Sequence, residues 1–135
     1  MITLKEVYLL QEREDFTFIA SEIIKYYKSK VPPGIKINTT RYKDDTLKGD
    51  YNVDKNTIQI RTSYTKVSDF VISVLHEIKH AIDTKKMGKN RYEKAYIEAG
   101  ELAIQKGGDF HDDNKFEETA ESWALKQYRK WKNKF

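Results

Sequence analysis

The chain has 135 residues, no cysteine and a formal net charge of +4, with 34% charged and 13% aromatic residues. The absence of cysteine excludes a disulfide scaffold and a metal site built from thiolates. This length and composition predict a single ordered domain over residues 1–135 rather than a disordered tail.

The start of the chain gives an expectation about localisation. Residues 1–10 lack a basic segment followed by an apolar run, because Lys5 and Glu6 interrupt them. We therefore expect no signal peptide, no membrane partner and a cytoplasmic protein. The mild positive charge lies largely between Lys126 and Lys134, which is typical of a solvated helix face and does not favour nucleic acid as the partner.

The first half of the chain predicts one helix and a small sheet. Helical spacing of apolar residues runs over about residues 15–28, and two prolines and a glycine at 32–34 end it. Residues 35–39 alternate as a strand does, and the alternating runs 51–53 and 58–61 flank turn-forming residues, which predicts a β-hairpin. The second hairpin strand is either an exposed edge that can pair with an extended peptide or an ordinary edge strand.

A continuous apolar stripe then predicts a long helix over Val67–Met87, with Thr65 or Ser68 as its cap and Gly88 closing it. Two more helices are predicted over residues 91–106 and 115–131. The expected fold is α+β. It has a small sheet of about three strands packed on the N-terminal helix and the long helix, with two further C-terminal helices.

His76, Glu77 and His80 form an H-E-x-x-H pattern inside the long predicted helix. Because an α-helix turns once in about 3.6 residues, the two histidines stand on one face and can bind one Zn²⁺. Glu77 is rotated by about 100° from His76, where it can reach a metal-activated water without being a ligand. The alternative is that the two histidines merely border a buried helix.

A catalytic zinc site uses three protein ligands, so one must come from outside the motif. Glu117 and Glu121 share a face of the last predicted helix, so one can bind the metal while the other accepts a hydrogen bond from a ligand histidine. Glu117 could instead close a capping box with Asn114. His111, in the preceding polar loop, and Glu118 are the alternative third ligands.

The H-E-x-x-H pattern followed by a distant E-x-x-A-acidic helix resembles the gluzincin branch of the zincin metallopeptidases. The compact size resembles the single-domain minigluzincins and the small zinc peptidases of phages and mobile elements. The resemblance covers about residues 50–131 and implies Zn²⁺ held by His76, His80 and Glu117. It also implies that Glu121, where the family usually has Asp, braces His76. Candidates for the family's transition-state-stabilising residue are Tyr64, Tyr92, Tyr96 and His111.

These observations predict a zinc metalloendopeptidase whose partner is a peptide or protein substrate. Glu77 would be the general base that takes a proton from the metal-activated water and passes it to the leaving amine. The alternative is a catalytically inactive or latent zinc-binding domain that acts as a protein- or nucleic-acid-binding module. Latency could arise if the segment after Trp131 covered the cleft.

Overall fold

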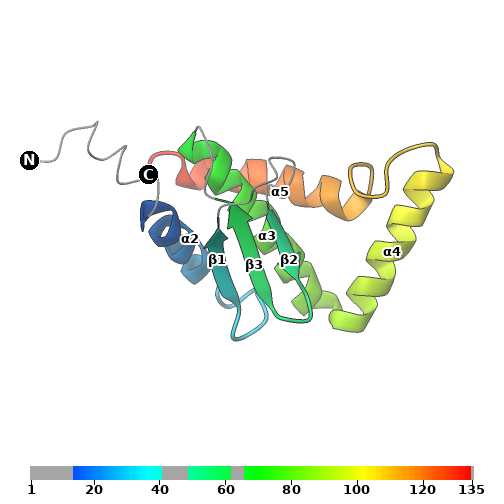
Figure 1. The fold of residues 1–135 in the computed structure, drawn as a ribbon, viewed down its shortest axis with the longest axis horizontal. Coiled ribbons are helices and arrows are strands. Elements are labelled where there is room, and N and C mark those ends of the chain that lie inside the picture. Colours follow the sequence, from blue (N-terminus) through cyan, green and yellow to red (C-terminus); the bar gives the residue numbers. More distant parts are fainter. Residues whose placement is uncertain (1–13, 41–48, 62–65, 135) are drawn as a thin grey trace, which may run out of the picture.

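The computed structural model describes residues 14–40, 49–61 and 66–134. The predicted α+β fold is confirmed: an N-terminal helix precedes a three-stranded mixed sheet, and three helices follow and pack against it (Figure 1). In chain order the elements are α2 (Glu14–Tyr26), β1 (Lys36–Thr40), β2 (Gly49–Asn52), β3 (Thr57–Arg61), α3 (Val67–Met87), α4 (Lys89–Gln105) and α5 (Lys115–Trp131).

None of the helices in the described part of the chain combines the length and the apolar character that crossing a bilayer requires.

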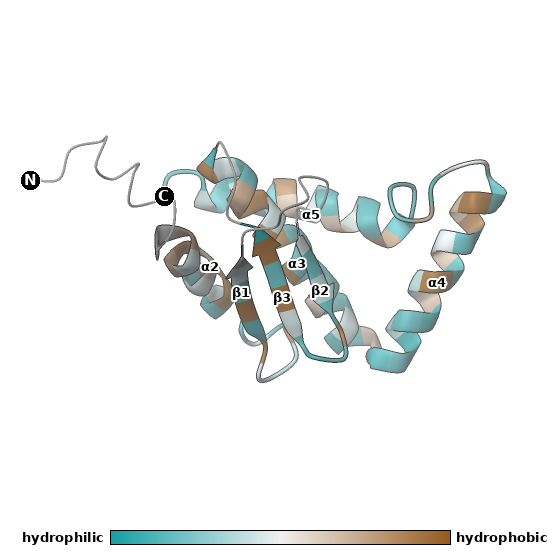
Figure 2. Ribbon diagram, in the orientation of Figure 1, coloured by the Kyte–Doolittle hydropathy of each residue, from teal (hydrophilic) through white to brown (hydrophobic). Residues whose placement is uncertain are grey.

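The strand order in the sheet is β1-β3-β2, with β1 parallel and β2 antiparallel to β3. The hairpin prediction is therefore confirmed, but the prediction that its second strand is an edge is wrong. β3 is the central strand because β1 pairs along the side that β2 leaves open. Its two isoleucines, Ile58 and Ile60, are fully buried. Figure 2 shows the hydrophobic residues of β3 beside the largely hydrophilic β2. The exposed edge on the hairpin side is β2.

The hairpin turn is fixed by Asn56. Its φ of 47° lies in the left-handed region, which asparagine tolerates better than most residues. The Asn56 amide donates to the carbonyl of Pro33 at 3.0 Å and its oxygen accepts from the Tyr51 hydroxyl at 2.7 Å. The turn is thereby tied both to its own strand and to the proline loop before β1.

The core forms around the apolar stripe of α3. Five apolar side chains of this stripe are at most 1% exposed: Phe70, Val71, Val74, Leu75 and Ile78. Burying a side chain of this kind stabilises the fold by about 1.5–3 kcal/mol each, before the opposing chain entropy is counted. The stripe packs against α2, β3 and α5, and this fixes the rotation of α3 about its axis. The other face of the helix, which carries the histidines, is consequently turned toward α4 and α5.

The two ends of α3 can be compared with the caps that the sequence predicted. Gly88, at φ 89°, closes the helix with its N–H donating to the Thr84 carbonyl at 2.8 Å, as predicted. The N-cap residue is Lys66, and no side chain caps it, so Ser68 is not the cap; Thr65 lies outside the described residues. Because α4 begins at Lys89, a single glycine reverses the chain between the two helices.

Helix α4 points away from the sheet, and the loop after it leads the chain back to α5 (Figure 1). It begins two residues before the predicted start and buries Tyr92, Ala99, Gly100 and Ala103. Leu102, although apolar, is 48% exposed. It lines a cavity between α4 and the start of α5.

The C-terminal half of α5 is anchored on Tyr27, the residue that follows α2. The Trp131 indole N–H donates to the Tyr27 hydroxyl at 3.2 Å, and Tyr27 in turn donates to Gln127 at 2.7 Å. Ala120 and Ala124, both fully buried, let α5 approach α3 closely. This docking determines which residues of the first turn of α5 reach the histidines of α3.

Candidate metal centre

Three of the predicted site residues meet where the first turn of α5 crosses the middle of α3. The Oε1 atom of Glu117 lies 2.7 Å from His76 Nε2 and 2.8 Å from His80 Nε2. The two Nε2 atoms are 3.2 Å apart. His80 and Glu117 are buried and His76 is half-buried. The three side chains form a group that could hold a metal ion, and we call this group the His-His-Glu cluster.

Asn114 explains why Glu117 is free to join the cluster. The Asn114 side chain caps α5 by accepting from the Phe116 N–H at 2.9 Å. Its own backbone N–H donates to the His111 carbonyl at 3.2 Å, not to Glu117. The capping box that the sequence left open is therefore not formed. The side-chain amide of Asn114 also donates to the Tyr96 carbonyl at 3.0 Å, which links the start of α5 to α4.

The donor set suits a transition-metal ion. Two imidazole nitrogens and one carboxylate oxygen are the ligands of many zinc sites, and thiolate is absent from the chain. Three ligand atoms on a four-coordinate ion with bonds of about 2.0–2.2 Å stand roughly 3.3–3.6 Å apart. The donor atoms here are within about 1 Å of that spacing, so the residues fit such an ion.

Each member of the cluster has a further polar partner. His76 Nδ1 lies 2.9 Å from Glu121 Oε2, which is the contact that the sequence predicted for the second carboxylate of α5. His80 Nδ1 lies 2.7 Å from the hydroxyl of Tyr92, and Tyr96 donates its hydroxyl to Glu117 Oε2. Partners of this kind fix the orientation and tautomer of metal ligands.

The charges in the cluster stabilise one another. Burial alone would lower the pKa of His76, but the hydrogen bonds and charges of Glu117, Glu77 and Glu121 outweigh it and raise this pKa to about 9. Burial would raise the pKa of Glu117, yet the hydrogen bonds from His76, His80 and Tyr96 hold it well below its usual range. Glu117 is thus a carboxylate at neutral pH, and a cation at the cluster competes with a proton on His76.

Glu77 lies beside the cluster without belonging to it. Its side chain is only 8% exposed, and burial raises its pKa, although the neighbouring histidines oppose that effect. A carboxyl group with a raised pKa accepts and releases protons closer to neutral pH than an ordinary glutamate does. It shares a cavity of about 340 Å³ with His80 and Glu117.

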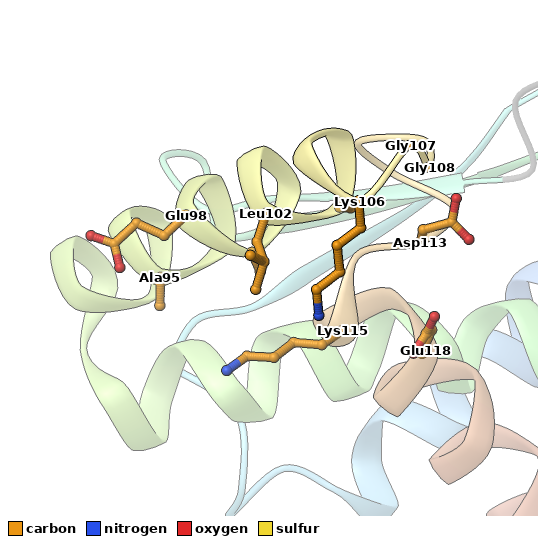
Figure 3. Close-up of a pocket in the computed structure, with 11 residues that line it drawn as sticks. Ala95, Glu98, Leu102, Lys106, Gly107, Gly108, Asp113, Lys115 and Glu118 are labelled. Carbon is orange, nitrogen blue, oxygen red and sulfur yellow. The ribbon is translucent and has the colours of Figure 1, made fainter.

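The cavity lies between the edge strand β2 and helix α4. Its lining residues are Gly49, Asp50, Tyr51, Val53, Glu77, His80, Tyr92, Glu93, Tyr96, Ile97, His111 and Glu117. A larger cavity, of about 710 Å³, lies between α4 and the start of α5, and Figure 3 shows residues that line it. That cavity is lined by Leu102, Lys106 and Glu118 among others and by no member of the His-His-Glu cluster. The smaller cavity is therefore the one from which a bound molecule could reach the cluster, through His80 and Glu117.

The two alternative third ligands lie outside the cluster. His111 Nε2 lies 3.3 Å from Glu117 Oε2, the oxygen that faces away from the histidines, and its side chain is 63% exposed. Glu118 is exposed and lines the larger cavity. Of the candidates for the transition-state-stabilising residue, Tyr92, Tyr96 and His111 line the smaller cavity, and Tyr64 lies outside the described residues.

From the sequence, Tyr92 and Tyr96 were only candidates for the transition-state-stabilising residue, and their hydrogen bonds to His80 and Glu117 were not predicted. The available signal was the spacing of Tyr92 and Tyr96, which puts both on one helical face, but that pattern is equally typical of ordinary core packing. Asp50 and Glu93 lie on opposite walls of the smaller cavity, and no sequence motif indicated that either belongs to the site.

Comparison of the chain with protein-family models, with curated proteins and with solved structures found no match. The α+β fold and the buried His-His-Glu cluster are consistent with a zincin-like metal site.

Proposed function

We propose that this protein is a zinc-dependent metallopeptidase of the gluzincin type. The observation that carries the proposal is the convergence of His76, His80 and Glu117 from two separate helices, with Glu77 buried in the cavity that His80 and Glu117 line. In this proposal the three cluster residues hold Zn²⁺. The resemblance of the motifs to gluzincins supports the same assignment, because it pairs H-E-x-x-H with a glutamate on a later helix.

When bound, zinc supplies Lewis-acid polarisation of a carbonyl and acidifies water. Glu77 is the general base: its carboxylate takes a proton as the water oxygen bonds to the peptide carbonyl carbon. Glu77 then returns that proton to the amine nitrogen as the carbon–nitrogen bond breaks, so it ends the cycle unprotonated. The raised pKa of Glu77 suits both transfers, since a buried carboxyl holds the proton more readily between them.

The edge strand β2 supplies a place for the substrate backbone. Gly49 and Asp50 line the cavity, and β2 pairs with β3 on one side only among the described strands. An extended peptide can add to such an edge through main-chain hydrogen bonds. In the proposed complex the peptide runs between β2 and α4, and its scissile carbonyl passes the His-His-Glu cluster.

The test is the Glu77→Gln variant of the full chain, with Glu118→Gln as a matched control on the exposed side of α5. We expect Glu77→Gln to keep one equivalent of zinc, measured by elemental analysis, while cleavage of casein or of a peptide library is abolished. Glu118→Gln keeps both zinc and activity, and a chelator removes the activity of the wild-type protein. Activity retained by Glu77→Gln would end the assignment of Glu77. Stoichiometric zinc with no cleavage by the wild-type protein would identify a binding module instead.

A further inference from the structure

Tyr92 and Tyr96 stand one turn apart on α4, and each reaches a different member of the His-His-Glu cluster. We propose that α4 is the positioning element of the metal site: Tyr92 fixes the ring orientation of His80 by partnering its Nδ1 atom, and Tyr96 selects the oxygen of Glu117 that faces the histidines. This inference rests on the proposed function, because it assigns these tyrosines to the same metal site.

The role of Tyr92 follows from the two nitrogens of His80. His80 Nε2 points to Glu117 and His76, so binding a cation there requires an unprotonated Nε2 and a proton on Nδ1. The group at Nδ1 is the Tyr92 hydroxyl, at 2.7 Å, and the Tyr92 side chain is 4% exposed. When Nε2 binds a cation, a hydrogen bond from Nδ1–H to this hydroxyl holds the ring in place at a position that is almost closed to water.

The two histidines differ in what their partners permit. The Glu121 carboxylate can only accept, so it keeps a proton on His76 Nδ1 with or without a cation. A tyrosine hydroxyl can accept or donate. It can therefore accept from His80 Nδ1–H when Nε2 binds a cation, and donate to Nδ1 when Nε2 carries the proton and donates to Glu117. Tyr92 allows His80 to change tautomer on metal loading without losing its partner.

Tyr96 acts on the carboxylate in a corresponding way. Glu117 Oε1 faces both imidazoles, whereas Oε2 accepts from the Tyr96 hydroxyl and also lies 3.3 Å from the exposed His111 Nε2. That division leaves one oxygen for a cation and keeps the second occupied. The tyrosine rings are held in place by packing, since their centroids lie 5.5 Å and 6.2 Å from the ring of Phe116 and 6.0 Å from each other.

The experiment compares Tyr92→Phe and Tyr96→Phe with Tyr26→Phe, an exposed tyrosine on α2, all in the full chain. Zinc affinity is measured by competition with a chromophoric chelator, and the cobalt-loaded proteins are compared by their visible spectra. We expect each α4 variant to lose about 10–100-fold in zinc affinity, the usual cost of removing a partner of a metal ligand. We also expect an altered cobalt spectrum, which a purely structural contribution to folding would not produce. Tyr26→Phe matches the wild type in both measurements.

Unchanged affinity and an unchanged cobalt spectrum in Tyr92→Phe would overturn the inference for His80, and the same result in Tyr96→Phe would overturn it for Glu117. If Tyr92→Phe does not fold, nitrogen-15 NMR of the zinc-loaded wild-type protein decides. A slowly exchanging proton on His80 Nδ1 is expected, and a proton on Nε2 or a rapidly exchanging Nδ1 proton would refute the role of Tyr92. A wild-type protein that binds no zinc would refute the proposed function itself, which is a separate outcome.

Discussion

His76 on α3 and Glu117 on α5 are 41 positions apart in sequence, yet His76 Nε2 and Glu117 Oε1 lie 2.7 Å apart. Neither residue has a local reason to point at the other. The contact exists because α5 docks along α3 through alanines that leave room for the two helices to approach. The His-His-Glu cluster is therefore a product of helix packing, and its properties can be tested one side chain at a time.

Replacing Glu117 with Gln should abolish high-affinity zinc binding, while Glu118→Gln should not. The neutral amide at position 117 is a poorer ligand, and it gives up the charge that stabilises His76 as well. We expect a loss beyond the roughly 10–100-fold that partners of ligands usually cost, measured by chelator competition. If Glu117→Gln binds normally and His111→Ala does not, His111 is the third ligand.

Glu121 should contribute to zinc affinity more through its hydrogen bond to His76 than through its charge. Glu121→Gln keeps an oxygen that can accept from His76 Nδ1–H, so we expect only a few-fold weaker zinc binding. Glu121→Ala removes the acceptor and should cost about 10–100-fold. Isothermal calorimetry of the two variants makes the comparison. Equal losses in both would show that charge, not orientation, is what Glu121 provides.

Without zinc, the stability of the protein should fall as the pH rises from about 6.5 to about 9. The folded protein raises the pKa of His76 to about 9 from an unfolded value of 6.5. Folding is then favoured by a protonated His76, fully so below pH 6.5, and this stabilisation is lost as the pH passes through the folded pKa. Urea unfolding in the presence of a chelator, at several pH values, measures the effect.

The control for this pH dependence is His76→Gln, which has no group that titrates at this position. We expect its free energy of unfolding to change less between pH 6.5 and 9 than that of the wild type. The same pH slope in both proteins would mean that another group is responsible.

The cavity should favour substrates with basic side chains near the scissile bond. Asp50 and Glu93 lie on its opposite walls, and none of its described lining residues is lysine or arginine. Each partly exposed ion pair is worth about 0.5–1 kcal/mol, so Asp50→Asn and Glu93→Gln should each reduce the preference for basic over neutral peptides by about 2- to 5-fold. The ratio of kcat/KM for matched peptides measures this. A ratio that stays constant in both variants would contradict the prediction.

Gly100→Ala should destabilise the protein, although alanine normally favours a helix by about 1 kcal/mol over glycine. A Cβ at position 100 would fall within 3.0 Å of the ring of Phe110. Phe110 belongs to the loop between α4 and α5, and its ring packs on α4 at Gly100. Thermal unfolding should show a lower midpoint for Gly100→Ala and little change for Glu101→Ala, an exposed neighbour. In a Phe110→Ala background the same substitution should become neutral or stabilising. A lowered midpoint there too would exclude the ring contact as the cause.

The order and type of the helices and strands could be predicted because the period of the apolar pattern is a local property. The stripe of α3 predicted a helix over the range that the structure gives, Val67–Met87, and the turn residues before Thr57 predicted the hairpin. The position of a strand in the sheet is not local. Nothing near β3 states that β1 pairs with it in parallel, so its central place was not predicted.

The sequence by itself determined that His76 and His80 share a face, because four residues make about one helical turn, and that Glu117 and Glu121 share another. It did not determine the hydrogen bonds of Tyr92 and Tyr96 to the His-His-Glu cluster or the place of β2 as the exposed edge. Those features depend on how α4 and the sheet are placed around α3, and that placement is set by packing between residues far apart in the chain. Helical periodicity fixes which side chains face the same way, whereas only the docking of whole elements decides what they meet.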